Sequence, residues 1–211
     1  MPRAVAAGPR RSAEQTREHI LEVTHDLFYW QGIRATGVDQ IAQRAGVAPT
    51  TLYRAFASKD DLVTAYVERA DRLYREWFET TLEHAEPDPR SRILHLFDAQ
   101  LEQVDPARCR GCPFLMVLAE IPDADLPAHR HAVASRRWVR QAFGRLTSDL
   151  ADVAPVDDPV ALADQLMLLF EGVYATAASV GRSGPTVQAR AIARALLPTA
   201  SAPDGASQER G

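Results

Sequence analysis

A segment near the N-terminus, residues 32–59 (GIRATGVDQIAQRAGVAPTTLYRAFASK), carries the side chains best suited to holding a ligand. Apolar spacing predicts a helix over 38–45 and a second from about 49 to 56, and Gly46 lies where a tight turn between them needs left-handed backbone. The side chains left on the outer face of the second helix are Thr50, Thr51, Tyr53 and Arg54. Small polar groups, a phenol and a guanidinium can reach phosphates and base edges in a major groove, so the pattern predicts a helix-turn-helix that binds DNA. The alternative is a plain helical hairpin with a solvated outer face.

The second candidate for chemistry is the segment Cys109-Arg-Gly-Cys112, which holds the two cysteines of the chain. Pro113 suits the first position of a helix, so the Cys112 thiol is expected at a helix N-terminus, with Arg108 and Arg110 as neighbouring cations. A helix dipole and nearby cations lower the pKa of a thiol and favour the reactive thiolate. Cys109 and Cys112 are therefore candidates for sensing oxidants. The alternative is that Cys112 only packs in the interior, where a thiol is inert.

The remaining sequence offers no spacing typical of a catalytic or metal centre. His129 and His131 are two residues apart and diverge on a helix, with no carboxylates converging there, so we expect no metal site. The rival class is an enzyme built on a helical bundle, but no Glu-x-x-His pair, nucleophile beside a base, or glycine-rich phosphate loop is recognisable. We therefore expect neither enzymatic activity nor a cofactor.

The elements that must position these residues are predicted to be helical throughout. Apolar residues recur three and four positions apart, and no alternating β-branched run appears, so we expect an all-α fold of about nine helices. Proline and glycine residues separate the helices. Four segments are predicted: a basic arm (1–11), a DNA-binding domain (12–58), a helical body (59–198) and a polar, disordered tail (199–211).

The composition is that of a globular protein, with 46% hydrophobic and 25% charged residues in 211. The formal net charge of −4 counts against nucleic-acid binding at first sight. However, residues 1–59 hold eight Lys and Arg against five acids, so this part has an excess of three positive charges and the remainder carries −7. With two cysteines only, no apolar run of about 18 residues and no secretory h-region, the sequence favours a cytoplasmic protein without a membrane span.

At this point the sequence resembles a known family. Over about residues 18–62 it is similar to the DNA-binding domain of the TetR family of bacterial transcriptional regulators. The residues that carry the resemblance are Thr36, Ile41-Ala42, Ala45-Gly46-Val47, Leu52-Tyr53, Phe56, Ser58-Lys59 and Leu62. Two positions depart from the family pattern: Ala48 stands where a capping Ser is usual, and Gly37 where Ser or Thr is common.

The resemblance implies roles for individual residues of the DNA-binding domain. Thr36 and Tyr53 would hold backbone phosphates, and Lys59 would contact phosphate together with the N-terminus of its helix. Arg44 would be a less direct phosphate contact. The side chains expected nearest base edges or phosphates are Thr50, Thr51 and Arg54.

The resemblance also implies a regulator, favoured as a repressor, that binds a palindromic double-stranded DNA operator as a homodimer and leaves it when a small-molecule effector binds. Residues 59–198 would bind the effector and form the dimer through helices of about 158–183 and 186–197. The apolar face expected at the dimer interface is Leu162, Leu166, Leu169, Val173 and Ala177, with Ala191, Ala195 and Leu196. The alternative is that this face belongs to the internal core. A second alternative is a thiol-responsive regulator that uses Cys109 and Cys112.

Large apolar side chains with a few polar anchors are typical of an effector pocket. The candidates are Phe97, Leu101, Phe114, Met116, Glu120, Trp138, Met167, Phe170, Glu171 and Tyr174. Asp98 and Gln100 are further candidate anchors. The alternative for each of these side chains is that it packs in the internal core and does not contact an effector.

Overall fold

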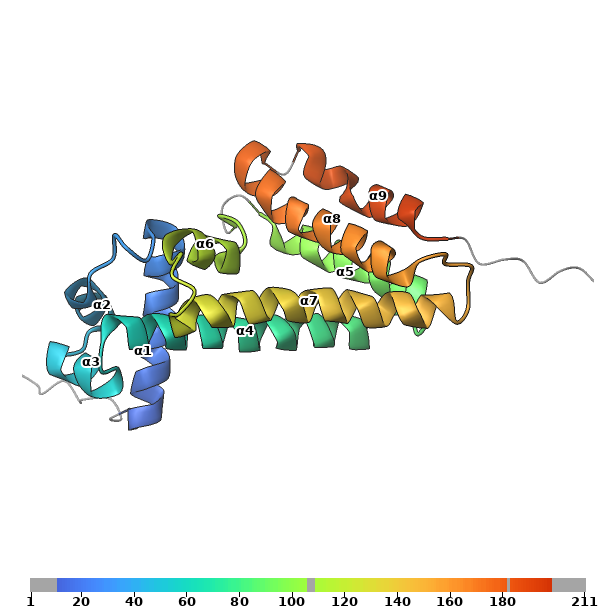
Figure 1. Cartoon of the computed structure of the whole chain (residues 1–211). Helices are drawn as coiled ribbons and strands as arrows, with labels where there is room; N and C mark the ends of the chain where they lie inside the picture. The colour runs from blue at the N-terminus through green and yellow to red at the C-terminus, as the bar shows by residue number, and fades with distance from the viewer. Residues whose placement is uncertain (1–10, 106–108, 182, 199–211) are drawn as a thin grey trace, which may run out of the picture. The chain divides into compact units, whose positions relative to one another are not determined.

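A computed structural model describes residues 11–105, 109–181 and 183–198, and all regular structure in these ranges is helical. This confirms the all-α prediction, with nine α-helices and one 3-10 turn in the described part (Figure 1). Most of the predicted arm and the whole predicted tail lie outside the described residues. The elements are α1 (Ala13–Gln31), α2 (Val38–Ala45), α3 (Pro49–Ala55), α4 (Lys59–Glu83), α5 (Pro89–Gln103), α6 (Pro113–Glu120), α7 (Pro127–Ala151), α8 (Pro159–Val180), η1 (Pro185–Gln188) and α9 (Ala189–Leu196).

The chain divides into two compact units, and the division passes through helices. The first unit contains residues up to Asp71 together with Val117–Ala132, and the second contains Arg72–Met116 and the residues from Val133 onward. Helices α4, α6 and α7 therefore each begin in one unit and end in the other. The predicted boundary at residue 58 instead coincides with the start of α4.

In the first unit, local signals fix the ends of the helices. Ser12 and Gln15 form a reciprocal capping box at the start of α1, with Gln15 N donating to Ser12 Oγ over 3.1 Å. Gly46 ends α2 with φ +66°, the left-handed conformation that the sequence predicted for this turn. Pro49 takes the first position of α3, and Ala48 before it caps no backbone amide, as its side chain predicts.

The second unit is built around packed aromatic rings. Adjacent ring centroids in this cluster lie 5.2 to 6.5 Å apart, mostly edge to face, which is the favoured arrangement. The rings belong to Trp77, Phe78, Phe97, Trp138, Phe143 and Phe170. Asp88 and Asp158 cap α5 and α8, each directly before a proline, and α9 packs on α5 and α8. The core thus joins α4, α5, α7 and α8.

Two glycines give a matched test of these backbone conformations. An added Cβ meets nothing within 4 Å at either Gly46 or Gly144, so only the backbone conformation distinguishes them. Gly46→Ala should lower the free energy of unfolding by about 1 kcal/mol, because alanine is strained in left-handed backbone. Gly144→Ala, inside α7, should raise it by roughly 0.5–1 kcal/mol. Urea denaturation measures both, and shifts of the same sign would contradict the assigned conformations.

Candidate nucleic-acid interface and regulatory core

Helix α3 buries one side and presents the other to solvent. Leu52 and Phe56 are 1% exposed, which fixes the helix against the rest of the first unit. Tyr53 is 52% exposed, and Thr50 and Arg54 are also exposed, whereas Thr51 is half-buried. The predicted outer face of the second helix is therefore the face that the structure exposes.

A groove of roughly 1040 Å³ runs beside this face, between α3 and the start of α1. Its lining includes Arg11, Arg17 and Arg54, together with Thr51 and Glu14. The Arg17 guanidinium lies over the Phe56 ring, 4.4 Å from its centroid, so packing fixes its position. Sequence reasoning counted Arg11 and Arg17 among the positive charges of this part but did not assign them to the interface. The groove places three guanidinium groups where a phosphate backbone could be held.

Lys59 and Arg44 are positioned less directly. Lys59 begins α4 and is half-buried, but Asp60 and Asp61 follow it in the same turn. Asp61 N already donates to Ser58 Oγ over 3.0 Å, so this amide is not free for a phosphate. The Lys59 side chain remains a candidate contact for an anion. Arg44 is exposed in the last turn of α2.

The prediction that the Thr36 side chain contacts a phosphate is wrong. Thr36 is 0% exposed, and its hydroxyl donates to Gly32 O over 2.8 Å. The hydroxyl satisfies a carbonyl at the end of α1 and so fixes the turn that leads into α2. The sequence motif identified an important position but did not reveal that the side chain faces inward.

Glu120, predicted as an anchor in the effector pocket, instead binds the turn between α1 and α2 in the first unit. Its carboxylate accepts a hydrogen bond from Arg34 N over 2.8 Å, and Arg34 Nε donates to its main-chain oxygen over 2.8 Å. A Cβ on Gly32, which has φ +95°, would lie 3.3 Å from the carboxylate. The pocket assignment of Glu120 is therefore wrong, because the last residue of α6 belongs to the first unit.

The interior of the second unit contains an ion pair. Arg136 Nη1 donates to Glu171 Oε1 over 2.6 Å, and these side chains are only 9% and 17% exposed. The guanidinium lies over two rings that pack edge to face on each other, 4.3 Å from the centroid of Phe114 and 5.0 Å from that of Tyr74. Arg136 Nη2 donates to Ser135 Oγ over 3.1 Å. A charged pair thus joins α7 to α8 inside an aromatic environment.

Several polar atoms around this pair have no hydrogen-bond partner within the protein. They are Arg136 Nε, Glu171 Oε2, Tyr74 Oη and Gln100 Oε1. Gln100 is itself fully buried and donates through Nε2 to Phe170 O over 2.8 Å, which brings it against α8 at the residue that precedes Glu171. Burial raises the pKa of the Tyr74 phenol, and the neighbouring Arg136 charge only partly opposes this. Because unpartnered buried polar atoms cost about 1–3 kcal/mol each, a cluster of them requires an explanation.

The expected low pKa of Cys112 is wrong. The thiol is 4% exposed, and burial raises its pKa to about 11 despite the Arg136 charge and the backbone amides of α6. Cys109 is also buried, and both cysteines are free thiols. Arg108, which was expected to help, lies outside the described residues. In this site the loss of hydration outweighs the helix N-terminus and the nearby cation.

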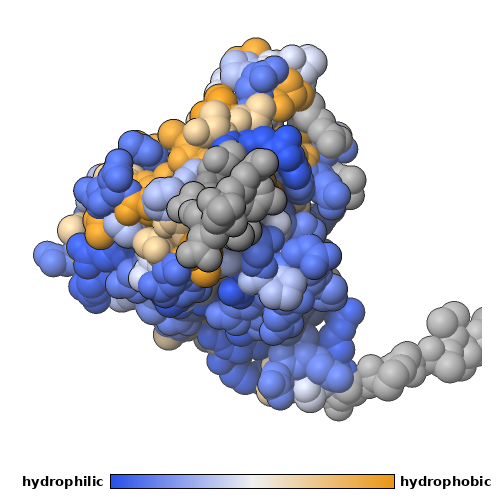
Figure 2. All heavy atoms as spheres, turned by 90° about the vertical axis from the view of Figure 1, so that its right-hand side faces the viewer, coloured by the Kyte–Doolittle hydropathy of each residue, from blue (hydrophilic) through white to orange (hydrophobic). Residues whose placement is uncertain are grey.

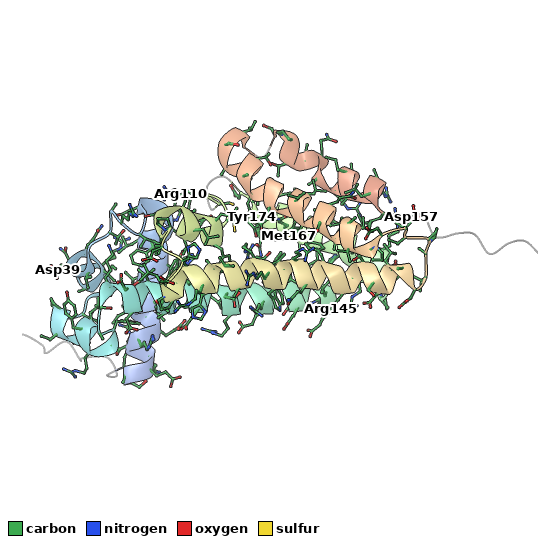
Figure 3. The ribbon with its side chains drawn as sticks, in the orientation of Figure 1. Asp39, Arg110, Arg145, Asp157, Met167 and Tyr174 are labelled. Carbon is green, nitrogen blue, oxygen red and sulfur yellow. The ribbon has the colours of Figure 1, made fainter. Side chains whose placement is uncertain are left out.

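The other predicted pocket residues mostly lie in the core. Phe97, Phe114 and Phe170 are at most 1% exposed, and Tyr174 is also buried. Leu101, Met116 and Met167 are half-buried, and Figure 3 labels Met167 and Tyr174 along α8 on the side toward α7. Trp138 lines a hollow of roughly 280 Å³. A groove of roughly 890 Å³ is lined by residues of α4 and α5, including Trp77 and Asp98, but by none of the ten pocket candidates.

The apolar residues expected at a dimer interface divide by exposure. Leu162, Leu166, Val173 and Ala177 are buried within the chain, so the alternative of an internal core holds for them. Leu169 and Leu196 are half-buried, and Ala191 and Ala195 are exposed. The exposed side of the same helical segment also carries large apolar side chains that were not predicted: Val160, Leu168, Val187 and Ile192, with Leu168 75% exposed. Figure 2 shows apolar surface in the upper part of its view, the level at which Figure 1 draws α8 and α9.

The apolar character of α8 also satisfies a membrane criterion. Among the described helices, it is the one long and apolar enough, by length and composition, to cross a bilayer, and 39% of the tested stretch is buried in the protein. Core helices of soluble proteins have the same character. Within the described residues, no three His, Cys, Asp or Glu side chains converge in a way that could hold a metal ion.

Known sequences resemble the chain most strongly around the helix-turn-helix. Residues 20–66 match the family described as bacterial regulatory proteins, tetR family. The chain is 36% identical to the HTH-type transcriptional regulator AcrR of Shigella flexneri over 67 residues, which are 32% of this chain and 31% of that protein. It is 25% identical to the HTH-type transcriptional regulator YjdC of Escherichia coli K12 over 156 residues, 74% of this chain and 80% of that protein.

Solved structures extend the likeness to most of the chain. A TetR-family transcriptional regulator from Streptomyces coelicolor has a TM-score of 0.80 and 28% identity, covering 86% of this chain and 94% of its own. The reduced form of NemR from Escherichia coli shares the fold, with a TM-score of 0.79, 23% identity and coverage of 89% and 99%. With its exposed α3, its helical second unit and these matches, the chain is not an enzyme but belongs to the TetR family of helix-turn-helix transcriptional regulators.

Proposed function

We propose that this protein is a cytoplasmic repressor that binds a palindromic DNA operator as a homodimer and is released by a small-molecule effector. The observation that carries the proposal is the exposed face of α3 beside a groove lined by Arg11, Arg17 and Arg54. A face of this kind fits a major groove, with arginines placed for the flanking phosphates.

The side chains on and around this face divide into candidates for base contacts and candidates for phosphate contacts. Thr50, Thr51 and Arg54 are the candidates for base edges, because hydroxyl and guanidinium groups can discriminate bases there. Tyr53, Lys59 and Arg17 are the candidates for phosphates, with Arg44 as a more distant contact. Phosphate contacts position the protein and add affinity on any sequence, whereas base contacts select the operator.

A symmetric operator needs a two-fold protein. The exposed apolar side of α8 and of the segment from η1 to α9 supports a dimer through this surface, with Leu168 near the middle of α8. The partner is then a second copy of the chain, and the residues buried within one copy stabilise the helices that form the interface.

The effector is proposed to bind in the second unit and to act by shifting the equilibrium between two conformations of the regulator. Helix α6 supports a connection to DNA binding, because Phe114 near its start packs on Arg136 and Glu120 at its end binds Arg34. The long helix α4 also continues from the first unit into the second.

The division of roles predicts two different outcomes in gel shifts. Lys59→Ala should weaken binding to all DNA sequences and reduce the salt slope of log K by about one, because one phosphate contact is lost. Arg54→Ala should also relax base preference at one operator position by about 1–3 kcal/mol. Arg137→Ala, exposed on α7 in the second unit, serves as the charge-matched control. If Arg54→Ala changed neither the affinity nor the base preference, Arg54 would not recognise a base.

The dimer surface predicts a position-specific effect of one charge. Leu168→Glu should convert the dimer to a monomer at micromolar concentration, since it places a carboxylate in an apolar interface. Val153→Glu is the control, because Val153 is 65% exposed in the turn after α7 and lies outside the helices proposed to form the interface. Light scattering coupled to size exclusion measures the mass. If Leu168→Glu and Val153→Glu were both still dimers, the interface would lie elsewhere.

The high pKa of Cys112 predicts slow alkylation near neutral pH. With a pKa of about 11, only about one thiol in ten thousand is ionised at pH 7, so the rate with iodoacetamide should rise about tenfold per pH unit up to pH 11. Mass spectrometry of a Cys109→Ser chain follows Cys112 alone, and the urea-unfolded chain is the control. Rapid alkylation at pH 7 in the folded protein would instead favour a thiol-responsive regulator.

A further inference from the structure

The buried ion pair of the second unit is made through a single hydrogen bond although both groups can form two. Guanidinium and carboxylate groups often pair through two parallel bonds. Here Arg136 Nη1 binds Glu171 Oε1, while Arg136 Nε and Glu171 Oε2 bind nothing in the protein. Arg136 therefore keeps one available donor, and Glu171 keeps one available acceptor.

The exposed pair on the same two helices provides a direct comparison. Arg140 on α7 binds Asp164 on α8 through both Nε and Nη2, the latter over 2.9 Å. This pair lies about one turn from the buried one along α7 and about two turns along α8, yet it is fully hydrogen-bonded and solvent-exposed. The spacing of α7 and α8 thus permits a two-bond pair, and the open arrangement is particular to the buried site.

Two further polar atoms and a set of rings complete the surroundings. Tyr74 Oη and Gln100 Oε1 are buried without partners, and both residues lie against the elements that carry the pair. Phe114 and Tyr74 lie on the guanidinium. The flat rings would stack on a planar molecule, and the unpartnered atoms would hydrogen-bond to it.

The charges of the site limit the charge of a ligand. Arg136 and Glu171 neutralise each other, so an added anion or cation would enter an apolar interior with no opposite charge left to pair with it. An uncharged group that holds an acceptor beside a donor, such as a primary carboxamide, satisfies Nε and Oε2 without this cost.

The groove nearest to these rings lies on α4 and α5. It has a volume of roughly 890 Å³ and is lined by Trp77, whose ring centroid is 5.5 Å from that of Tyr74. Trp77 thus contributes both to the lining of the groove and to the ring packing next to the buried pair.

We propose that the open Arg136–Glu171 pair is the polar anchor of the effector site and that the effector is an uncharged, planar aromatic molecule carrying adjacent hydrogen-bond acceptor and donor groups. That this ligand acts as an effector rests on the proposed function. Its binding at this site does not depend on whether it releases the protein from DNA.

Three isosteric probes test the charge and the hydrogen bonds: benzamide, benzoate and benzamidine. Isothermal titration of the full chain without DNA should show benzamide binding, with benzoate and benzamidine at least tenfold weaker. Glu171→Gln leaves the Arg136 charge unpaired, so this variant should bind benzoate more tightly than benzamide. Arg136→Gln should invert the preference toward benzamidine.

Asp164→Asn is the matched control, because it removes a carboxylate from the exposed pair on the same helices and should leave all three affinities unchanged. Thermal unfolding confirms that each variant is folded. If Glu171→Gln does not fold, Tyr74→Phe takes its place: it removes only a hydroxyl and should weaken the binding of benzamide severalfold. The proposal is overturned if no probe binds the native protein, if benzoate or benzamidine binds it best, or if Asp164→Asn changes the preference as Glu171→Gln does. Operator release by benzamide is measured separately in gel shifts: binding without release would count against the proposed function and not against the site.

Discussion

Two opposite charges buried beside aromatic rings place the strongest constraint on the second unit. Removing a guanidinium or a carboxylate from water costs several kcal/mol, and only a well-placed partner offsets this. The Arg136–Glu171 contact therefore fixes α7 against α8 at one level, and Phe114 and Tyr74 must stay where they cover the guanidinium. Apolar side chains of similar volume often stabilise a core as well or better. The proposed effector site would account for a pair that is both buried and incompletely hydrogen-bonded.

The DNA-binding unit shows the same dependence on a few internal polar contacts. Thr36 closes the end of α1 from inside, and Glu120 covers Gly32 while it holds Arg34. These contacts fix the turn before α2, and the apolar residues of α3 orient that helix in turn. The outward side chains of α3 need no partners of their own, because the backbone that carries them is already fixed.

Much of this architecture could be predicted from local pattern, and the failures share one cause. The turn at Gly46 and the outward face of α3 follow from residues within one or two turns of each other, so spacing revealed them. Glu120 and Arg34 are 86 positions apart, and no local signal connects them. Cys112 was misjudged because helix ends and neighbouring cations are visible in a sequence but burial is not. Periodicity also marked α8 as apolar without showing which of its sides faces inward.

The length of α6 makes its two ends mechanically dependent. Glu120 is six positions after Phe114, so the helix rises only about 9 Å from one to the other. A segment this short has no proline after its first position and no glycine at which it could bend. We therefore propose that a ligand which displaces contacts around Arg136 acts on the first unit through this helix, because Phe114 at its start packs on Arg136 and Glu120 at its end holds Arg34. The hydrogen bond from Arg34 N to Glu120 supports the turn before α2, so it is the contact on which such a signal would act.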